Sequence, residues 1–200
     1  MKFENVTGII LAGGEGSRMG GVDKGLVNFF GKPMFQHVLE RIAPQVGTII
    51  ISANRHLEDY QRSGYAVVSD NNNEGSSNSE YQGPVAGILT GLENTKTSYA
   101  VIVPCDAPLV CMNLVEPLIK SALENDSDMT LFRVDGRIQP LFGLFRVSLL
   151  DDLRAYYQAG ERKLIRWCES HAPQIVDYHG PSEVFSNINT LEELKQLEKA

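Results

Sequence analysis

The chain has 200 residues, of which 42% are hydrophobic and 22% are charged, a composition typical of a globular protein. Eighteen Lys and Arg residues stand against 25 Asp and Glu residues, so the formal net charge is −7 and no overall positive field is present to hold DNA or RNA. No apolar run approaches the length of a membrane span and the first residues do not resemble a signal peptide, so we expect a cytoplasmic protein of one domain, residues 1–200.

Short apolar segments in the first half alternate with helical patterns. The apolar segments are rich in β-branched residues and are bounded by Gly, Pro, Asn or Asp, which is typical of buried parallel strands. We expect strands at 8–11, 48–51, 66–68 and 100–103, and helices at 33–41, 85–92 and 114–123. This order predicts an α/β fold, a doubly wound, mostly parallel sheet with helices on both faces, whose ligands bind beyond the carboxyl ends of the strands.

The second half contains three further predicted strands, at 129–134, 139–145 and 175–178. We expect them to complete the sheet and to add a lobe that faces the substrate. One polar, low-complexity segment, 71–82, follows the third predicted strand. Its composition fits a loop over the site and fits a disordered surface insertion equally well.

The first predicted strand runs directly into the sequence LAGGEGSRMG. Gly13, Gly14 and Gly16 leave backbone N–H groups accessible to an anion, because no Cβ blocks its approach. Arg18 adds a bidentate guanidinium and Lys24 adds a mobile point charge. Glycines and cations together would suit a triphosphate, although a glycine-rich loop by itself is weak evidence.

Two other phosphate-binding patterns compete for this loop. A Walker A loop is excluded, because the lysine of GGVDKG is followed by glycine instead of Ser or Thr. The spacing GEGSRMG resembles a variant of the Rossmann glycine fingerprint, and Asn54 and Arg55 could receive the 2′-phosphate of NADP. Further glycines delay the first predicted helix to Pro33, whereas a Rossmann helix begins inside its glycine motif. An NADP-dependent oxidoreductase therefore ranks behind a protein that binds a triphosphate at this loop. The two cations are expected in an extended loop.

Asp106 ends the fourth predicted strand, between Pro104 and Pro108. The two prolines restrict the backbone and fix its direction. A carboxylate at a strand end is the kind of oxygen ligand that Mg²⁺ takes beside phosphate oxygens and water. The alternative is an exposed turn aspartate. Asp70 occupies a similar position after the third predicted strand.

The sequence LAGGEGSRMGGVDKGL is similar to the signature of the MobA-like nucleotidyltransferases, in which this loop wraps a nucleoside triphosphate. The portion GGVDKG resembles the molybdenum cofactor guanylyltransferases of that family, and the tripeptide AGG favours guanine over the Leu-Ala-Ala-Gly of related cytidylyltransferases. The resemblance implies that Asp106 is the Mg²⁺ ligand and that Asp70 contacts guanosine. The positions it implies for binding GTP are Leu11, Ala12, Gly13, Gly14, Lys24, Ser52, Asp70, Gly83 and Asp106.

One of these positions departs from the family pattern. Ser52 stands where the resemblance leads us to expect an asparagine that contacts the nucleotide, which puts this contact in question. The segment YQGPVAG, which contains Gly83, resembles the family's GPLAG, where a helix start and small residues pack beside the nucleotide.

The C-terminal part carries further matches to the same guanylyltransferases, in GERK and FSNINTLEEL. The resemblance implies that Arg162 and Lys163 hold the terminal phosphate of a pterin, although both also fit solvated helix charges. Asn187 and Asn189 offer amide donors and acceptors for a pterin or a phosphate. The pattern TLEE independently predicts a capping box that opens the last helix.

Together these matches imply that GMP is transferred from GTP to the terminal phosphate of molybdenum-bound molybdopterin, with release of pyrophosphate. Residues 1–110 would mainly bind GTP and 111–200 would mainly face molybdopterin. Arg18, Lys24 and Asp106 would be the catalytic residues, and proteins that deliver or accept the cofactor would be partners. The alternatives are a cytidylyltransferase or another sugar- or pterin-phosphate nucleotidyltransferase of this fold, the NADP-dependent oxidoreductase, and a nucleotide-binding module without chemistry.

Overall fold

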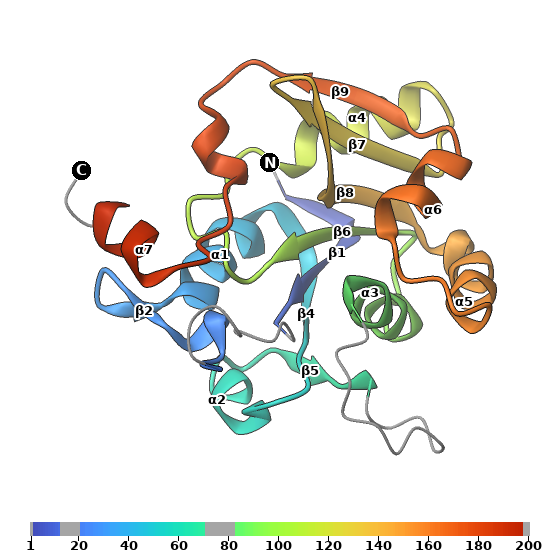
Figure 1. The fold of residues 1–200 in the computed structure, drawn as a ribbon. Helices are drawn as coiled ribbons and strands as arrows, with labels where there is room; N and C mark the ends of the chain where they lie inside the picture. Colours follow the sequence, from blue (N-terminus) through green and yellow to red (C-terminus); the bar gives the residue numbers. More distant parts are fainter. Residues whose placement is uncertain (1, 13–20, 71–82, 198–200) are drawn as a thin grey trace.

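The computed structural model describes residues 2–12, 21–70 and 83–197. A seven-stranded sheet with the order β5-β4-β1-β6-β8-β7-β9 forms the centre of the molecule (Figure 1). The strands are β1 (Phe3–Leu11), β4 (Val46–Ser52), β5 (Ala66–Val68), β6 (Tyr99–Pro104), β7 (Met129–Val134), β8 (Arg137–Arg146) and β9 (Gln174–Tyr178). All pairings are parallel except those that β8 makes with β6 and β7. The predicted α/β fold with a mostly parallel sheet is confirmed.

The sheet has an apolar core on each face, because neighbouring residues of a strand point to opposite sides. Ile10 of β1 and Val103 of β6 belong to one buried cluster, and the adjacent Ile9 and Ile102 belong to the other. Helices α1 (Met34–Ile42) and α4 (Val115–Glu124) pack on the first cluster. Helices α3 (Gly83–Glu93), α5 (Leu150–Gln158) and α6 (Leu164–Ser170) pack on the second (Figure 1). Burial on both faces explains why these strands are continuous apolar runs.

The three predicted helices correspond to α1, α3 and α4, each within two residues of the expected bounds. In α1 the apolar residues Met34, Val38 and Ile42, which recur at helical spacing, are all buried. Pro33 lies at the N-cap of α1 and also ends a small hairpin of β2 (Asn28–Phe29) and β3 (Lys32–Pro33). None of the helices in the described residues is long and apolar enough to cross a membrane.

Lys24 lies in a short 3-10 helix, η2 (Lys24–Leu26). The prediction that this cation lies in an extended loop is therefore wrong. The turn forms because the Asp23 carboxylate accepts a hydrogen bond from the Gly25 N–H, at 3.1 Å. The delay of the first α-helix is confirmed for residues 21–33. Gly13, Gly14, Gly16 and Arg18 lie outside the described residues, as does the predicted loop 71–82.

The carboxyl ends of the four parallel strands lie at one edge, as predicted. Leu11 pairs with both Ser52 and Pro104, and Ser52 pairs with Val68. The C-terminal segment returns to this edge through η6 (Ser182–Phe185) and ends in α7 (Leu191–Leu197), which lies beside the β2–β3 hairpin (Figure 1). A third buried cluster joins these parts; it consists of Phe29, Met34, Ile188 and Leu194.

Candidate active site

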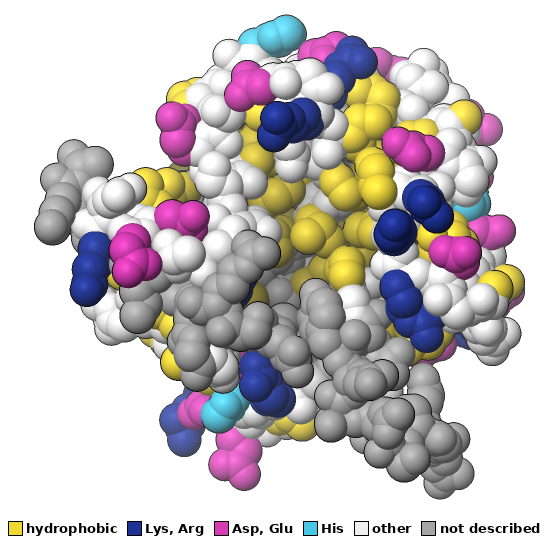
Figure 2. Space-filling view, in the orientation of Figure 1, with side chains coloured by type: hydrophobic (Ala, Val, Ile, Leu, Met, Phe, Trp, Pro, Cys, Tyr) yellow, Lys and Arg dark blue, Asp and Glu magenta, His cyan; other side chains and the backbone are white. Residues whose placement is uncertain are grey.

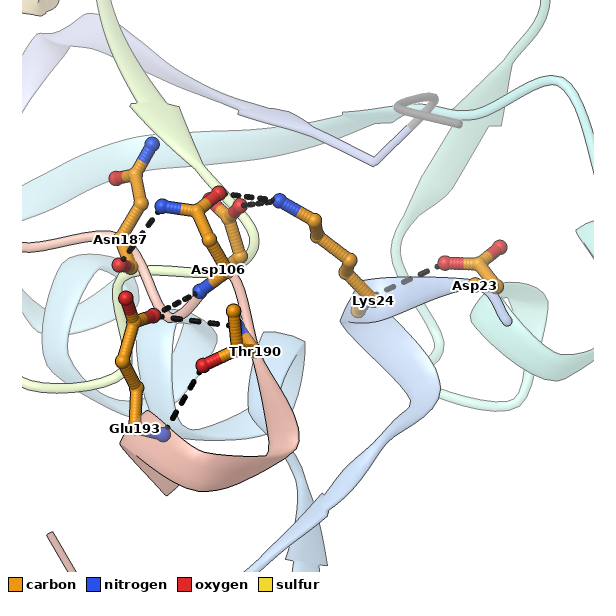
Figure 3. Close-up of polar contacts among 8 residues, drawn as sticks. Asp23, Lys24, Asp106, Asn187, Thr190 and Glu193 are labelled. Atoms are coloured by element: carbon orange, nitrogen blue, oxygen red, sulfur yellow. Dashed lines mark hydrogen bonds and ion pairs between the residues drawn. The ribbon is translucent and has the colours of Figure 1, made fainter. Parts of the chain in front are cut away.

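The Lys24 ammonium contacts two groups from distant parts of the chain (Figure 3). Its Nζ donates to Asp106 Oδ2 at 3.1 Å and to Asn189 Oδ1 at 2.6 Å. The Lys24 and Asp106 side chains are only 17% and 11% exposed, so water screens their charges weakly. The structure therefore brings together three of the predicted site residues, from the turn after β1, the end of β6 and the segment before α7.

Asp106 is held by the strand before it and by the C-terminal segment. The N–H of Cys105 donates to the Leu11 carbonyl at 2.9 Å and extends the pairing of β1 with β6 by one step. The carbonyl of Asp106 accepts from the Ile188 N–H at 2.8 Å. Burial raises the pKa of the Asp106 carboxyl, and the Lys24 ammonium opposes this rise. A carboxylate fixed at a strand end is the kind of oxygen ligand that could hold a metal ion.

The predicted capping box is confirmed and orients Asn189. The Glu193 N–H donates to Thr190 Oγ1 at 3.1 Å. In return, Glu193 Oε2 accepts from the N–H groups of Thr190 and Asn189, at 3.2 and 2.7 Å (Figure 3). Asn189 Nδ2 also donates to the carbonyl of Asn187 at 3.2 Å. The same interactions that begin α7 thus fix the residue that accepts from Lys24.

Asn187 lies next to this arrangement and carries an amide oxygen with unused capacity. Its Oδ1 is buried and has no hydrogen-bond partner within the described part of the chain. Such an oxygen costs free energy unless something donates to it. A ligand with an N–H or O–H group at this place would satisfy it.

Ser52 is buried at the end of β4, close beneath α3. Its carbonyl accepts from the Ala12 N–H at 2.7 Å. A Cβ placed on Gly87 of α3 would lie 3.1 Å from Ser52 Oγ, so helix and strand end approach closely here. The short serine side chain fits this narrow space, which gives a packing reason for the departure from asparagine.

Asp70 lies half-buried just beyond β5. Asn54 Oδ1 holds this strand end, because it accepts from the Asp70 N–H at 3.2 Å and from Ser69 Oγ at 3.0 Å. Asp70 Oδ1 is buried without a hydrogen-bond partner among the described residues, and burial raises the pKa of its carboxyl. Asn54 therefore has a structural role that sequence reasoning missed, whereas Asp70 keeps an acceptor for a ligand.

Arg162 and Lys163 are exposed and directly precede α6. Arg162 Nη1 donates to the carbonyls of Tyr157 and Glu161, at 2.8 and 2.9 Å, and its guanidinium lies 4.0 Å from the centroid of the Tyr157 ring. A Cβ placed on Gly83 would lie 3.7 Å from the Arg162 carbonyl, so this segment runs beside the start of α3. Within the ranges described above, no hydrogen bond joins either cation to Lys24 or Asp106.

The face of the molecule drawn in Figure 2 is hollowed near its centre. Hydrophobic side chains gather at the centre of the hollow, over the sheet, and Lys and Arg side chains lie on its side near α5 and α6. An apolar floor with cations on one side suits a flat ring that carries a phosphate.

Sequence reasoning also missed a buried contact below Lys24. The Tyr60 hydroxyl donates to Asp23 Oδ1 at 2.6 Å. Tyr60 belongs to the short helix α2 (Leu57–Gln61) and is fully buried. No pattern in the sequence signals a contact between two side chains 37 positions apart on different elements.

The α/β fold of this chain also occurs among solved nucleotidyltransferases. A nucleotidyl transferase from Methanothermobacter thermautotroptrophicus shares the fold, with a TM-score of 0.74 over 97% of this chain and 96% of that chain, at 17% identity. Molybdopterin-guanine dinucleotide biosynthesis protein A from Archaeoglobus fulgidus superimposes with a TM-score of 0.75 over 96% of this chain and 97% of that one, at 25% identity.

Sequence comparisons are more specific. The profile of the MobA-like NTP transferase domain matches residues 8–174. A molybdenum cofactor guanylyltransferase from Acidovorax sp. (strain JS42) is 44% identical, over 97% of this chain and 95% of that protein. Another, from Histophilus somni (strain 129Pt), is 40% identical over 96% of both chains. The chain therefore belongs to the MobA-like NTP transferase family and, within it, to the molybdenum cofactor guanylyltransferases, which confirms the resemblance noted in the sequence.

Proposed function

We propose that this chain, as one nucleotidyltransferase domain, transfers GMP from GTP to the terminal phosphate of molybdopterin and releases pyrophosphate. The observation that carries the proposal is the position of Lys24, which contacts both Asp106 and Asn189. Asp106 belongs to the predicted GTP and metal site, and Asn189 to the predicted pterin site. A lysine in contact with both lies where donor and acceptor would meet.

The reaction needs little acid–base chemistry from the protein. An oxygen of the terminal phosphate forms a bond to the α-phosphorus of GTP, and the bond from that phosphorus to the oxygen of the β-phosphate breaks. The acceptor is a phosphate monoester and is already anionic, so no general base is required. The protein therefore contributes mainly by positioning the two substrates and by stabilising charge on the departing pyrophosphate.

Asp106 is the residue we assign to hold Mg²⁺. To hold the metal through Oδ2, its carboxylate would exchange the contact with the Lys24 ammonium. The residues with described positions contain no cluster of three or more His, Cys, Asp or Glu that would form a metal cage of protein ligands alone. This fits Mg²⁺, which commonly binds one or two carboxylates together with phosphate oxygens and water. When bound, the metal would neutralise charge on the phosphates.

The cations near the triphosphate are assigned to the leaving group. Lys24 has a mobile ammonium that can donate to phosphate oxygens, and Arg18 would add a bidentate guanidinium. In the nucleotide-binding part, Asp70 Oδ1 is a buried acceptor without a partner among the described residues. Guanine presents two adjacent donors, N1–H and the exocyclic amino group, whereas cytosine presents one donor beside an acceptor. A carboxylate at this place therefore favours guanine.

The acceptor is assigned to the hollowed face and the C-terminal segment. Asn187 Oδ1 and the Asn189 side chain offer polar contacts near Lys24. Arg162 and Lys163 lie beside the start of α3 and would hold the terminal phosphate. To do so, the Arg162 guanidinium would have to exchange its contacts with two carbonyl groups for the phosphate.

Ligand stabilisation separates this function from the NADP-dependent oxidoreductase. A ligand present at a hundred times its Kd adds about 2.7 kcal/mol to the free energy of unfolding. We expect GTP with Mg²⁺ to raise the melting temperature and NADPH to leave it unchanged. Stabilisation by NADPH alone would contradict the proposal.

Turnover separates a transferase from a binding module. We expect pyrophosphate release when molybdopterin is added with GTP, and little release with ATP, CTP or UTP. A preference for CTP would make the chain a cytidylyltransferase. Binding of GTP without release of pyrophosphate would indicate a module without chemistry.

A further inference from the structure

The turn that presents Lys24 lies directly on a buried pair of polar side chains, Asp23 and Tyr60. Asp23 precedes Lys24 in the chain and is only 6% exposed. Its Oδ1 accepts two hydrogen bonds, from the Tyr60 hydroxyl at 2.6 Å and from the Gly25 N–H at 3.1 Å. One carboxylate oxygen therefore closes the turn and also ties it to α2.

The Tyr60 hydroxyl is held in a fixed position. The residue is fully buried, and its ring packs edge to face on Phe35 of α1, with ring centroids 4.8 Å apart. Such aromatic contacts restrict the ring, and a ring without access to solvent has little freedom to reorient. The hydroxyl thus acts as a rigid anchor for Asp23.

Gly25 shows how closely the turn sits on this anchor. A Cβ at this position would lie 2.4 Å from Tyr60 Oη and 3.1 Å from Cys105 Sγ. Tyr60 and Cys105 thus form the floor beneath the turn, and Cys105 is directly followed by Asp106. The two partners of the Lys24–Asp106 ion pair therefore rest on the same floor.

If only stability mattered, burying the polar side chains of Asp23 and Tyr60 would be unfavourable. A carboxylate taken out of water loses hydration, and apolar residues of similar shape would often be equally or more stabilising. Burial raises the pKa of the Asp23 carboxyl, and the hydrogen bonds from Tyr60 and Gly25 oppose this rise. What the polar pair provides, and an apolar pair would not, is a directional link from α2 to the turn that bears Lys24.

We propose that Asp23 and Tyr60 are positioning residues that hold Lys24 in the geometry required for GMP transfer. This inference rests on the proposed function. Neither side chain touches Asp106 or Asn189 through a hydrogen bond in the described residues; both act through the backbone of the turn. Small displacements of a group that stabilises charge lower the rate strongly, so a buried anchor for Lys24 bears directly on turnover.

Three substitutions test the anchor. Tyr60→Phe removes only the hydroxyl and should lower kcat about tenfold, with KM for GTP within about twofold of wild type. Asp23→Ala removes both hydrogen bonds and should lower kcat further. Asp23→Asn keeps an oxygen that can accept both, so it should be about tenfold more active than Asp23→Ala. Equal activities of the two Asp23 variants would contradict positioning by hydrogen bonds.

Tyr99→Phe is the matched control. Tyr99 is also buried, and its hydroxyl accepts a hydrogen bond from Arg146 at 3.0 Å, but it begins β6 and so lies at the opposite end of the sheet from Asp106. We expect this variant to keep the wild-type kcat. A fall in kcat equal to that of Tyr60→Phe would show that losing any buried tyrosine hydroxyl slows the enzyme, which would overturn the inference.

A double-mutant cycle decides whether the anchor acts through Lys24. In a Lys24→Ala background, Tyr60→Phe should cause no further loss of GMP transfer, because the group that it positions is absent. An equal loss in both backgrounds would overturn the inference. If Tyr60→Phe does not fold, Asp23→Ala and Asp23→Asn are compared in the Lys24→Ala background instead, where they should transfer GMP at the same rate.

The inference and the proposed function fail in different ways. A wild-type protein that transfers no GMP contradicts the proposed function and the inference together. An active wild type whose rate is unchanged by Tyr60→Phe contradicts the inference alone.

Discussion

Among the ion pairs of the described residues, two that join distant parts of the chain differ clearly in geometry and in surroundings. Arg133 of β7 and Asp177 of β9 face each other in register and form two parallel hydrogen bonds, at 2.6 and 2.7 Å. Lys24 and Asp106 are joined by a single contact of 3.1 Å. By contact geometry alone, the arginine pair is the better ion pair.

Their surroundings reverse this ranking. The side chains of Arg133 and Asp177 are 45% and 46% exposed, so water and salt screen their interaction. Lys24 and Asp106 are largely buried, and Lys24 also donates to Asn189. In the exposed pair, each charge is satisfied by its partner. In the buried pair, the ammonium could bind phosphate and the carboxylate could bind a metal ion. A buried charge pair with imperfect geometry indicates a ligand site better than an ideal pair at the surface.

The largest expected effect comes from breaking the buried pair. Lys24→Ala and Asp106→Ala should each lower turnover about a hundredfold, because losing one contact that stabilises developing charge costs roughly 3 kcal/mol. Pyrophosphate release measures the loss, and thermal melting checks that both variants fold. Near wild-type turnover in a folded variant would remove that residue from the catalytic site.

A smaller effect is expected at the third group around Lys24. Asn189→Ala removes the oxygen that accepts from Lys24 at 2.6 Å and should lower kcat/KM for molybdopterin about tenfold. The KM for GTP should change much less, because the residue belongs to the acceptor side. A selective rise in the KM for GTP would show that Asn189 belongs to the GTP subsite and would contradict this prediction.

The capping box should affect stability more than chemistry. Thr190→Ala removes the side-chain cap of α7 and should lower the free energy of unfolding by about 1 kcal/mol, as measured by denaturant titration. Glu193 still accepts from the Asn189 N–H, so turnover should fall less than in Asn189→Ala. A loss of turnover as large as in Asn189→Ala would show that the cap itself controls the site.

The smallest effect is expected at the exposed pair. Arg133→Met should leave turnover unchanged and lower the melting temperature slightly at low salt, with the difference shrinking as salt is added. Arg133 lowers the pKa of the Asp177 carboxyl. The stabilisation is therefore present above the ordinary aspartate pKa and is lost as the pH falls through the lowered value. A difference in melting temperature that persists in acid would contradict this account.

Much of the fold could be predicted because its signals are local. The β-branched runs and their Gly or Pro boundaries predicted the parallel strands and their shared carboxyl edge. The start of β1 was missed, because Glu4 and Asn5 are exposed and polar and do not extend the apolar run. The β2–β3 hairpin has strands of two residues each, which is too short for any period to be visible.

The site was predictable in composition but not in contacts. Strand ends indicated Asp106 and Asp70, and family resemblance indicated Asn189, but no spacing predicted that Lys24 contacts Asp106 and Asn189. The contact of Tyr60 with the Lys24 turn depends on how α2 packs against α1, and only the folded chain determines this.

The most direct test of the central claim is the fate of labelled GTP incubated with molybdopterin and Mg²⁺. Label in the α-phosphate should appear in the pterin product, and label in the γ-phosphate should appear in pyrophosphate, in equal amounts. Folded Lys24→Ala and Asp106→Ala proteins should form both products about a hundredfold more slowly. Transfer of the γ-label to the pterin, or no transfer of the α-label by the wild-type protein, would contradict the account.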